Sequence, residues 1–568
     1  MKKVRKITTS SRTVCLLASM LIYGLSKQGV NAQTSSSATD ALRNIEQNKQ
    51  ELNRSLARPR VKQTPPPMEH EQDMKRLKEV SVESPLFTKE LMNYWIGEIN
   101  QSVSGQKLNG FKAFAWELFQ SKGYLAYITT TTNSTPEGSA LKIHVVIPQV
   151  GQVSVVSIDG EQGKEFLDEV AQRFNAIYKK GMPVDIQGFE NQLNAASFDL
   201  PVDLEVSMRQ MNATEVDVVV HVRSLETQTG RVLGGVIHSN NYGLQQFGRT
   251  QLLGSVRLAG LTPTSELTLT AQQSTGVHYY RAEYEAPLIG TGTRLRLFAS
   301  QVESTAINTK GFSTEAGTGL TKLLKTDRIG RWLTSTEAAR RETKNWGSDI
   351  LTSDRVDQQI RFKLRAESFN GWIENFNNEF LVTVGRVNLD RNASDKTNDA
   401  TTGLNIAGNY RKIEMNGSLS QVIDQSRTLT GSVRWRAQAA SKNLDGYNRL
   451  SLGGINGIRA YTSTDGVGDQ GAQLSFDLIH QVVPDVWAGL FYDVGVVKNN
   501  HLPIANATDT GAYFLRGAGW QLGGTIDKFN WNLSTAQAFG KTPGPGVWTT
   551  ANTKSGDFRV NFAVSRSF

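Results

Sequence analysis

The chain has 568 residues, of which 38% are hydrophobic and 20% are charged, and its formal net charge is +9. Its mean hydropathy of −0.36 is typical of a soluble protein, but it does not exclude a membrane β-barrel, because polar lumen-facing residues lower the average. After residue 32, no segment approaches the about 20 consecutive apolar residues of a membrane helix, which excludes a helical membrane domain.

Residues 1–32 have the features of a bacterial secretory signal peptide. Five basic residues lie within the first twelve, the apolar core 14–23 is short, and Val30-Asn31-Ala32 offers a cleavage site. Cleavage removes six basic residues and no acidic ones, which lowers the formal charge from +9 to +3 and argues against nucleic-acid binding. The only cysteine, Cys15, leaves with the signal, so the mature chain has no disulfide and no cysteine metal site.

Residues 33–58 contain a predicted polar helix over 40–58, with Asp40 as its cap and a thin apolar stripe that includes Ile45. A helix of this length spans roughly 28 Å, close to the ~30 Å bilayer core, and would fit inside a wet lumen. A surface helix or a disordered arm is the alternative. Residues 59–76, with three consecutive prolines at 65–67, predict an extended linker.

Two small α+β units follow, at residues 77–150 and 151–229, and both have the order β-α-α-β-β. In the first unit we predict strand 78–82, helices 86–103 and 111–121, and strands 124–131 and 140–147. In the second we predict strand 153–158, helices 166–178 and 185–193, and strands 202–208 and 215–222.

Residues 230–568 lose helical periodicity and show short alternating runs between turn residues. In 359–367, apolar residues occupy one side and Arg361, Lys363, Arg365 and Glu367 the other. A fully charged face is unfavourable in a dry core but natural where one face meets lipid and the other water, so we predict a transmembrane β-barrel of about 16 strands. The polar stretch 304–348 is interpreted either as surface loops or as strands that the pattern does not reveal. Further strands are predicted at 293–300, 432–438, 472–478, 487–496 and 530–537.

The last eleven residues alternate and end on an aromatic residue, Phe568. Phe558, Val560, Phe562 and Val564 share one face of a strand. An ordinary sheet strand is the alternative, but together with the preceding pattern the segment predicts the strand that closes a membrane barrel.

Two motifs stand in the barrel region: Ile458-Arg459-Ala460-Tyr461, followed by Gly468-Asp469, and the strand motif Phe491-Tyr492-Asp493-Val494-Gly495. Period two places Leu490 and Tyr492 on the lipid face and Phe491, Asp493 and Gly495 on the inner face. An inward carboxylate favours a cationic partner, and arginine offers a bidentate one. Taken singly, Arg459 is better explained as a solvated loop charge, and Asp493 as a polar residue that wets the lumen.

Taken together, these motifs resemble the outer-membrane transporters of two-partner secretion, the haemolysin-secretion and filamentous-haemagglutinin type. In that family a loop returns into the lumen with a Val-Arg-Gly-Tyr/Phe tip, whose arginine meets the aspartate of a Phe-x-Asp-x-Gly wall strand. Ile458, Arg459 and Tyr461 match the tip, and Phe491, Asp493 and Gly495 match the wall. The resemblance therefore implies an Arg459–Asp493 ion pair. Ala460 departs from the family's glycine, which leaves the tip conformation open.

The resemblance implies that the two α+β units are polypeptide-transport-associated (POTRA) domains in the periplasm, that 33–58 is a plug helix, and that 239–243 with Gly248 and Arg249 form the first barrel strand and turn. It also implies a location in the outer membrane of a Gram-negative bacterium. The implied partner is a large exoprotein of adhesin or cytolysin type with an N-terminal secretion domain, which docks on the POTRA units. Outer-membrane lipids and the barrel assembly machinery are further implied partners, and no cofactor is implied.

Two other barrel functions remain open at this point: a barrel-assembly factor of the same superfamily, and a passive porin. An enzyme is not predicted, because the sequence has no Gly-x-Ser-x-Gly elbow and no HExxH motif. Gly540-Lys541-Thr542 resembles the end of a P-loop, but Thr535 stands where the first glycine belongs.

Overall fold

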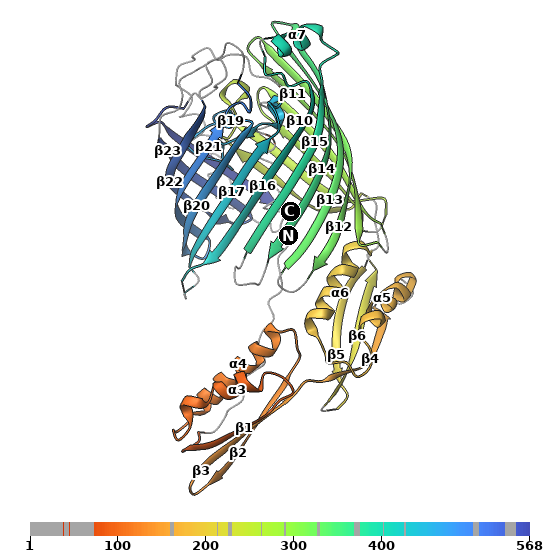
Figure 1. The fold of residues 1–568 in the computed structure, drawn as a ribbon, viewed down its shortest axis with the longest axis vertical. Helices are drawn as coiled ribbons and strands as arrows, with labels where there is room; N and C mark the ends of the chain where they lie inside the picture. The colour runs from red at the N-terminus through yellow and green to blue at the C-terminus, as the bar shows by residue number, and fades with distance from the viewer. Residues whose placement is uncertain are drawn as a thin grey trace, which may run out of the picture.

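The computed structural model describes Ala38, Ile45 and residues 73–568, except 159–163, 201, 213, 225–229, 263, 289–290, 327–329, 369–374, 402, 425, 427, 504–510 and 540–552. Within this part, the chain forms two α+β units below a large β-barrel (Figure 1). None of the described helices combines the length and the hydropathy needed to cross a bilayer. The predicted signal peptide, most of the predicted helix 40–58 and most of the linker lie outside the described residues.

The first α+β unit is a three-stranded sheet covered by two helices. Its strand order is β1-β3-β2, with β1 parallel and β2 antiparallel to β3. Aromatic side chains, including the fully buried Trp95 and Phe111, fill the space between helices and sheet. The elements are β1 (Leu77–Glu83), α3 (Thr88–Asn93), the 3-10 turn η1 (Ile96–Glu98), α4 (Gly105–Ser121), β2 (Tyr127–Thr135) and β3 (Gly138–Val146).

The second unit repeats this architecture with the order β4-β6-β5. Alternate valines of the central strand, from Val216 to Val222, are fully buried and form its core. The side chain of Asp185 caps α6 by accepting a hydrogen bond from the backbone of Gly188 at 3.0 Å. The elements are β4 (Gln149–Ser157), α5 (Lys164–Ile177), α6 (Ile186–Asp199), β5 (Val202–Gln210) and β6 (Glu215–Ser224).

Backbone hydrogen bonds join the two units to each other. Ile186 N donates to Gly123 O at 2.8 Å, and Leu125 N donates to Val184 O at 3.3 Å. This pairing explains why the strand expected from residue 124 begins only at Tyr127: residues 124–125 pair with the second unit instead. The second unit in turn meets the barrel rim through α6, where Arg294 donates to the carbonyl of Phe198 at 3.1 Å.

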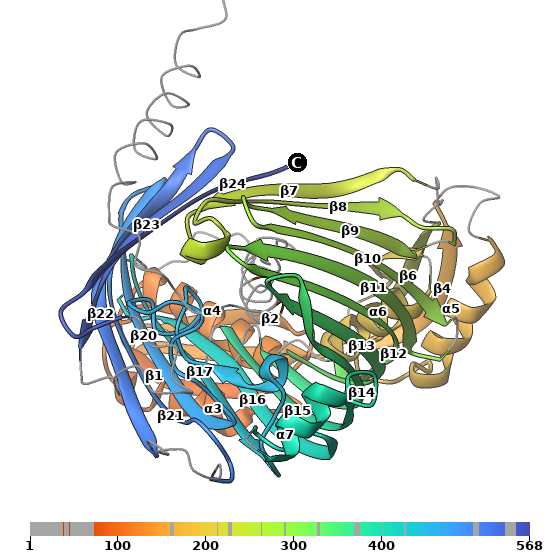
Figure 2. The same ribbon diagram turned by 90° about the horizontal axis from the view of Figure 1, so that it is seen from above.

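Sixteen antiparallel strands of the described chain close into the barrel, in sequence order with β24 beside β7 (Figure 2). This confirms the predicted fold class. The strands are β7 (Val232–Asn240), β8 (Gln251–Ala259), β9 (Glu266–Gln273), β10 (Val277–Leu288), β11 (Thr293–Ala306), β12 (Thr309–Thr326), β13 (Gly330–Gly347), β14 (Ile350–Ser368), β15 (Asn375–Asn388), β16 (Gly408–Val422), β17 (Leu429–Ala440), β20 (Gln470–Val483), β21 (Val486–Lys498), β22 (Ala512–Ile526), β23 (Phe529–Phe539) and β24 (Phe558–Ser567).

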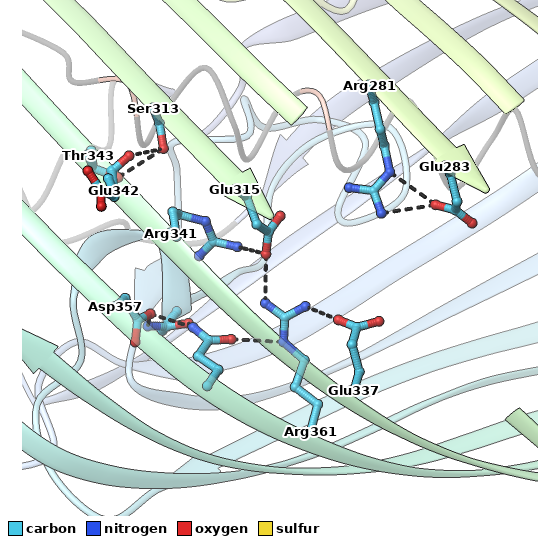
Figure 3. A network of polar contacts seen from close by, with 12 residues as sticks. Arg281, Glu283, Ser313, Glu315, Glu337, Arg341, Glu342, Thr343, Asp357 and Arg361 are labelled. Carbon is cyan, nitrogen blue, oxygen red and sulfur yellow. Dashed lines mark hydrogen bonds and ion pairs between the residues drawn. The ribbon is translucent and has the colours of Figure 1, made fainter. Parts of the chain in front are cut away.

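Where side chains alternate clearly along a wall strand, the apolar ones face outward and the polar ones face the lumen. On β14, Ile360 and Phe362 are 48% and 49% exposed on the outside. Arg361 points inward and pairs with Glu337 at 2.6 Å and Glu315 at 3.1 Å, within a network of charges from β10 to β14 (Figure 3). The charged face predicted for 359–367 therefore lines the lumen.

The stretch 304–348 is not a set of loops, because it contains the end of β11 and the whole of β12 and β13. The glycines of β12 lie on its inner face, threonines and lysines interrupt its outer face, and charges occupy both faces of β13, so neither strand shows clean alternation. Their pairing with each other and with neighbouring strands, rather than side-chain pattern, defines them.

The C-terminal residue seals the barrel seam. Phe568 exchanges backbone hydrogen bonds of 3.0 and 2.8 Å with Gly235 of β7, and its ring covers the position that a Cβ on Gly235 would take. Nearby, Phe562 N donates to the side-chain oxygen of Asn241 at 2.8 Å, and Asn241 N donates to the carbonyl of Phe562 at 3.2 Å. The first strand ends at Asn240, so 241–243 belong to the turn rather than to the strand.

Candidate functional site

The lumen loop, residues 441–469, connects β17 to β20 and folds back into the barrel. It contains the turn η3 (Gly446–Asn448) and the short pair β18 (Leu450–Ser451) and β19 (Val467–Gly468). Its tip, residues 453–461, is a compact turn in which Ile458 N donates to Leu452 O at 2.7 Å. Gly457 permits this turn, because a Cβ there would collide with the carbonyl of Leu452.

The tip brings Arg459 onto the inner face of β21. Its guanidinium makes a bidentate contact with Asp493, through Nε at 3.0 Å and Nη2 at 2.8 Å. The Arg459 backbone N–H also donates to the same carboxylate at 3.0 Å. Arg459 is 4% exposed and Asp493 is fully buried. The structure therefore brings together the two residues that the sequence paired.

Arg459 has further partners that the sequence motifs do not contain. Its Nη1 donates to Asp477 of β20 at 2.6 Å, and Gln521 of β22 joins the same carboxylate at 2.9 Å. Arg434 of β17 pairs with the other Asp477 oxygen at 3.3 Å. Two arginines thus face two aspartates, and this balance offsets the desolvation of each charge.

Phe491 lies under the guanidinium, with the Arg459 Cζ 3.6 Å from its ring centroid. The ring fits because Gly519 of the next strand has no side chain: a Cβ there would lie 2.7 Å from Phe491. Gly495 plays the same part for Ile458, whose Cδ1 would be 3.2 Å from a Cβ at that position. The glycines of the wall therefore admit the loop.

Tyr461 closes the tip with apolar packing and one hydrogen bond. It is fully buried, and its hydroxyl donates to the carbonyl of Phe539 at 3.1 Å. The cluster that surrounds the tip consists of Leu450, Leu452, Ile458, Ala460, Tyr461, Phe491, Val497, Tyr513, Leu515, Ala536 and Ala538.

Gly468 and Asp469 lie at the stem of the loop rather than at its tip. Asp469 is fully buried, pairs with Arg449 at 3.0 Å and accepts from His501 N at 2.8 Å. Gly468 packs against the backbone of Lys498, where a Cβ would collide with the carbonyl oxygen. Both residues therefore fix the point at which the loop leaves the wall.

The base of the loop is held by a different part of the wall, β14. Asn448 donates to Asp357 at 2.8 Å and accepts from Gln359 at 2.9 Å. Tyr410 donates to the same Asp357 carboxylate at 3.0 Å, and Asp445 pairs with Arg355 at 2.6 Å. No sequence motif indicated this second attachment, whose members are about ninety residues apart along the chain.

Comparisons with known proteins agree with this architecture. A model of the haemolysin secretion/activation proteins ShlB/FhaC/HecB matches residues 222–523, which include the lumen loop and Asp493. No curated protein sequence matches the chain.

Among solved structures, CdiB from Acinetobacter baumannii has 13% identity and a TM-score of 0.57, covering 94% of this chain and 100% of its own. CdiB from Escherichia coli has 16% identity and a TM-score of 0.57, with coverages of 95% and 100%. BamA from Haemophilus ducreyi lacking POTRA domains 1–3 has 12% identity, a TM-score of 0.50 and coverages of 87% and 100%. These likenesses show the fold. Because the family model matches more than half of the sequence, the chain belongs to the ShlB/FhaC/HecB family of haemolysin secretion/activation proteins, the outer-membrane transporters of two-partner secretion.

Proposed function

We propose that this two-partner secretion transporter exports one large exoprotein, in an unfolded state, through its lumen, and that the lumen loop rearranges to open the path. The observation that carries the proposal is the buried Arg459 on the wall residues Asp493 and Asp477. Removing one partner of a buried ion pair leaves an unpaired charge at a cost of about 3–5 kcal/mol. If the whole tip moves into a wet lumen, water solvates both Arg459 and the aspartates that it leaves. The loop would then have a second accessible position besides the one on the wall.

A second movable element is the predicted plug helix, 33–58. Two residues of this segment are described, and both contact the inner face of the barrel wall. Ala38 N donates to the inward side chain of Asn345 at 2.9 Å, and Ile45 packs beside Val277 and Val302. Displacement of this segment by an entering chain would clear the lumen.

The two α+β units are proposed to lie in the periplasm and to receive the exoprotein. In the first unit, β2 is an edge strand whose outer side is unoccupied by other described strands. Strand addition to such an edge gives backbone hydrogen bonds to an unfolded chain of almost any sequence.

The two alternatives are less well supported. A passive porin needs an open lumen, whereas this one contains a loop attached at tip, stem and base. A barrel-assembly factor rests on the BamA likeness alone, which at 12% identity concerns the fold.

The test is the protein content of the culture medium. We expect deletion of this chain in its native strain to remove one large protein from the medium, and the unaltered gene to restore it. Arg459→Ala or Asp493→Asn should not restore it, although both barrels insert. Lys310→Ala is the control, because its pair with Asp349 at 2.8 Å is exposed outside the lumen. Normal export by both lumen variants would contradict the proposed role of the loop.

A further inference from the structure

A row of long polar side chains crosses the outer wall of the barrel on four adjacent strands. Arg340 of β13 lies opposite Gln358 of β14, which lies opposite Arg386 of β15, which lies opposite Asn409 of β16. Arg411 follows on β16, diagonal to Arg386, at a spacing of about 7–8 Å for such pairs.

These side chains point away from the lumen. Arg341, the next residue after Arg340, is 4% exposed and belongs to the inner network (Figure 3). Gln359, the next residue after Gln358, is also 4% exposed and contacts Arg361 of that network. Arg340, Arg386 and Arg411 are exposed and share a face with the outer apolar residues Ile360 and Val384.

The row marks one border of the apolar surface. The next level toward the α+β units pairs Ala338 with Ile360, Ile360 with Val384 and Val384 with Arg411, so Arg411 lies at the edge of the apolar surface. The level below it contains the exposed Phe362 and Ile413. On the other side of the row the outer face carries Glu342 and Lys344 instead. The arginines therefore lie where lipid headgroups meet the barrel, at the end remote from the α+β units.

The charge of this row is only partly balanced. Arg340 pairs with Glu342 at 2.8 Å, and Glu342 is shared with Arg391 at 2.7 Å. Within the described chain, the guanidinium groups of Arg386 and Arg411 form neither a hydrogen bond nor an ion pair. Asp390 lies near Arg386 but pairs with Lys396. Two adjacent guanidinium groups are thus available to an anion.

A shallow groove of about 990 Å³ runs beside these arginines. Small side chains, Ala316 and Ala338, form part of its lining, and the longer Arg340, Ile360 and Arg386 rise around it. A groove with an apolar lining on one side and guanidinium groups on the other is complementary to a lipid that has an anionic headgroup.

We propose that this groove binds a phosphorylated glycolipid of the outer leaflet. Its phosphate lies between Arg386 and Arg411, because guanidinium groups bind phosphate through paired, charge-assisted hydrogen bonds. An acyl chain covers Ala338, Ile360 and Val384. The inference rests on the orientation given in the proposed function, with the α+β units in the periplasm and α7 (Ala393–Thr401) outside the cell.

The test measures binding of rough-type lipopolysaccharide to the purified full-length barrel in detergent. An arginine near an anionic lipid surface contributes about a fivefold change in affinity, so Arg386→Gln with Arg411→Gln should weaken binding roughly 25-fold. Enzymatic removal of the lipid phosphates should weaken binding to the unaltered barrel by a similar factor. Arg566→Gln is the matched control, since Arg566 is an exposed outer-face arginine of β24 at the other end of the barrel.

Unchanged affinity in the double variant would overturn the inference, as would complete displacement of the lipid by millimolar inorganic phosphate, which would indicate a simple anion site. If the glutamine pair does not yield a folded, heat-modifiable barrel, Arg386→Lys with Arg411→Lys decides the matter. Lysine keeps the charge but loses the bidentate geometry, so about threefold weaker binding supports the site and equal binding refutes it.

The orientation is checked separately with a cysteine placed at Lys396 in α7. The mature chain has no other cysteine, so an impermeant maleimide should label this position on intact cells. Absence of labelling would contradict the proposed function, whereas a change in lipid affinity tests only the glycolipid site.

Discussion

Ala460 is the tip residue that departs from the family pattern, and the structure explains how it is accommodated. Among the described residues other than glycine, those with positive φ do not include Ala460, so its methyl group causes no backbone strain. The methyl group faces Gly517 of β22, where a Cβ would lie 2.9 Å from it. The tip can approach the wall this closely only if one of positions 460 and 517 is a glycine. In this chain the glycine is Gly517, on the wall.

At the residue scale, we therefore expect Gly517→Ala to displace the tip. Overpacking of this kind costs about 1–3 kcal/mol, and the strain should move Arg459 away from Asp493 and reduce export. Adding Ala460→Gly should restore export, because it returns the lost space. Export is measured in the culture medium, with Gly254→Ala as control, since a Cβ at that glycine meets nothing within 4 Å. A double variant as impaired as Gly517→Ala alone would contradict this account.

The lumen loop, as an element, is attached at three places that have different chemistry. At the tip, Arg459 forms an ion pair with Asp493 of β21. At the stem, Asp469 pairs with Arg449, and at the base, Asn448 bonds to Asp357 of β14. Movement of the tip alone can leave the base in position, because the two attachments use strands on different sides of the barrel. We therefore expect the base to limit how far the loop can move.

We expect Asn448→Asp to loosen the base, because it places a second carboxylate against Asp357, where the present contact is 2.8 Å. Single-channel conductance in planar bilayers should rise or fluctuate more. The exchange variant, Asn448→Asp with Asp357→Asn, should return conductance to normal, since Gln359 and Tyr410 still find acceptors. Identical conductance for the single variant and the unaltered barrel would argue against an attachment at this point.

At the scale of the whole molecule, the barrel involves residues from near both ends of the chain. The lumen contains Ala38 and Ile45 from the N-terminal segment, while Phe568 closes the wall at the C-terminus. Ile45 packs against a cluster near the end of the barrel remote from the α+β units, which includes Leu244 and Phe247 of η2 (Gln245–Phe247) and its flank.

If the proposed plug is correct, deletion of residues 40–58 should raise ion conductance, because it removes Ile45 from its packing against the inner wall. Ile45→Asp should give a smaller increase, since it weakens one packing contact while the segment stays present. Both are measured in planar bilayers with equal amounts of heat-modifiable barrel. Unchanged conductance after the deletion would count against a plug.

The sequence alone determined the inner and outer faces of single strands, because period-two alternation is a local property. It placed Phe491 and Asp493 inside and Leu490 and Tyr492 toward lipid, as the exposed fractions confirm. The same rule places Asp477 inside, yet nothing local marks Asp477 or Gln521 as a partner of Arg459. It also failed for β12 and β13, whose outer faces are too polar to alternate clearly.

Only the tertiary structure decided which inner residues meet. Strand register and barrel closure bring Asp477, Asp493 and Gln521 to one place, and the return of the loop brings Arg459 to them. The base contact with Asp357, the glycine that receives Ala460 and the arginines of the outer wall likewise depend on pairing between strands. Such pairing is fixed by the closed sheet as a whole, because each strand's position follows from both of its neighbours.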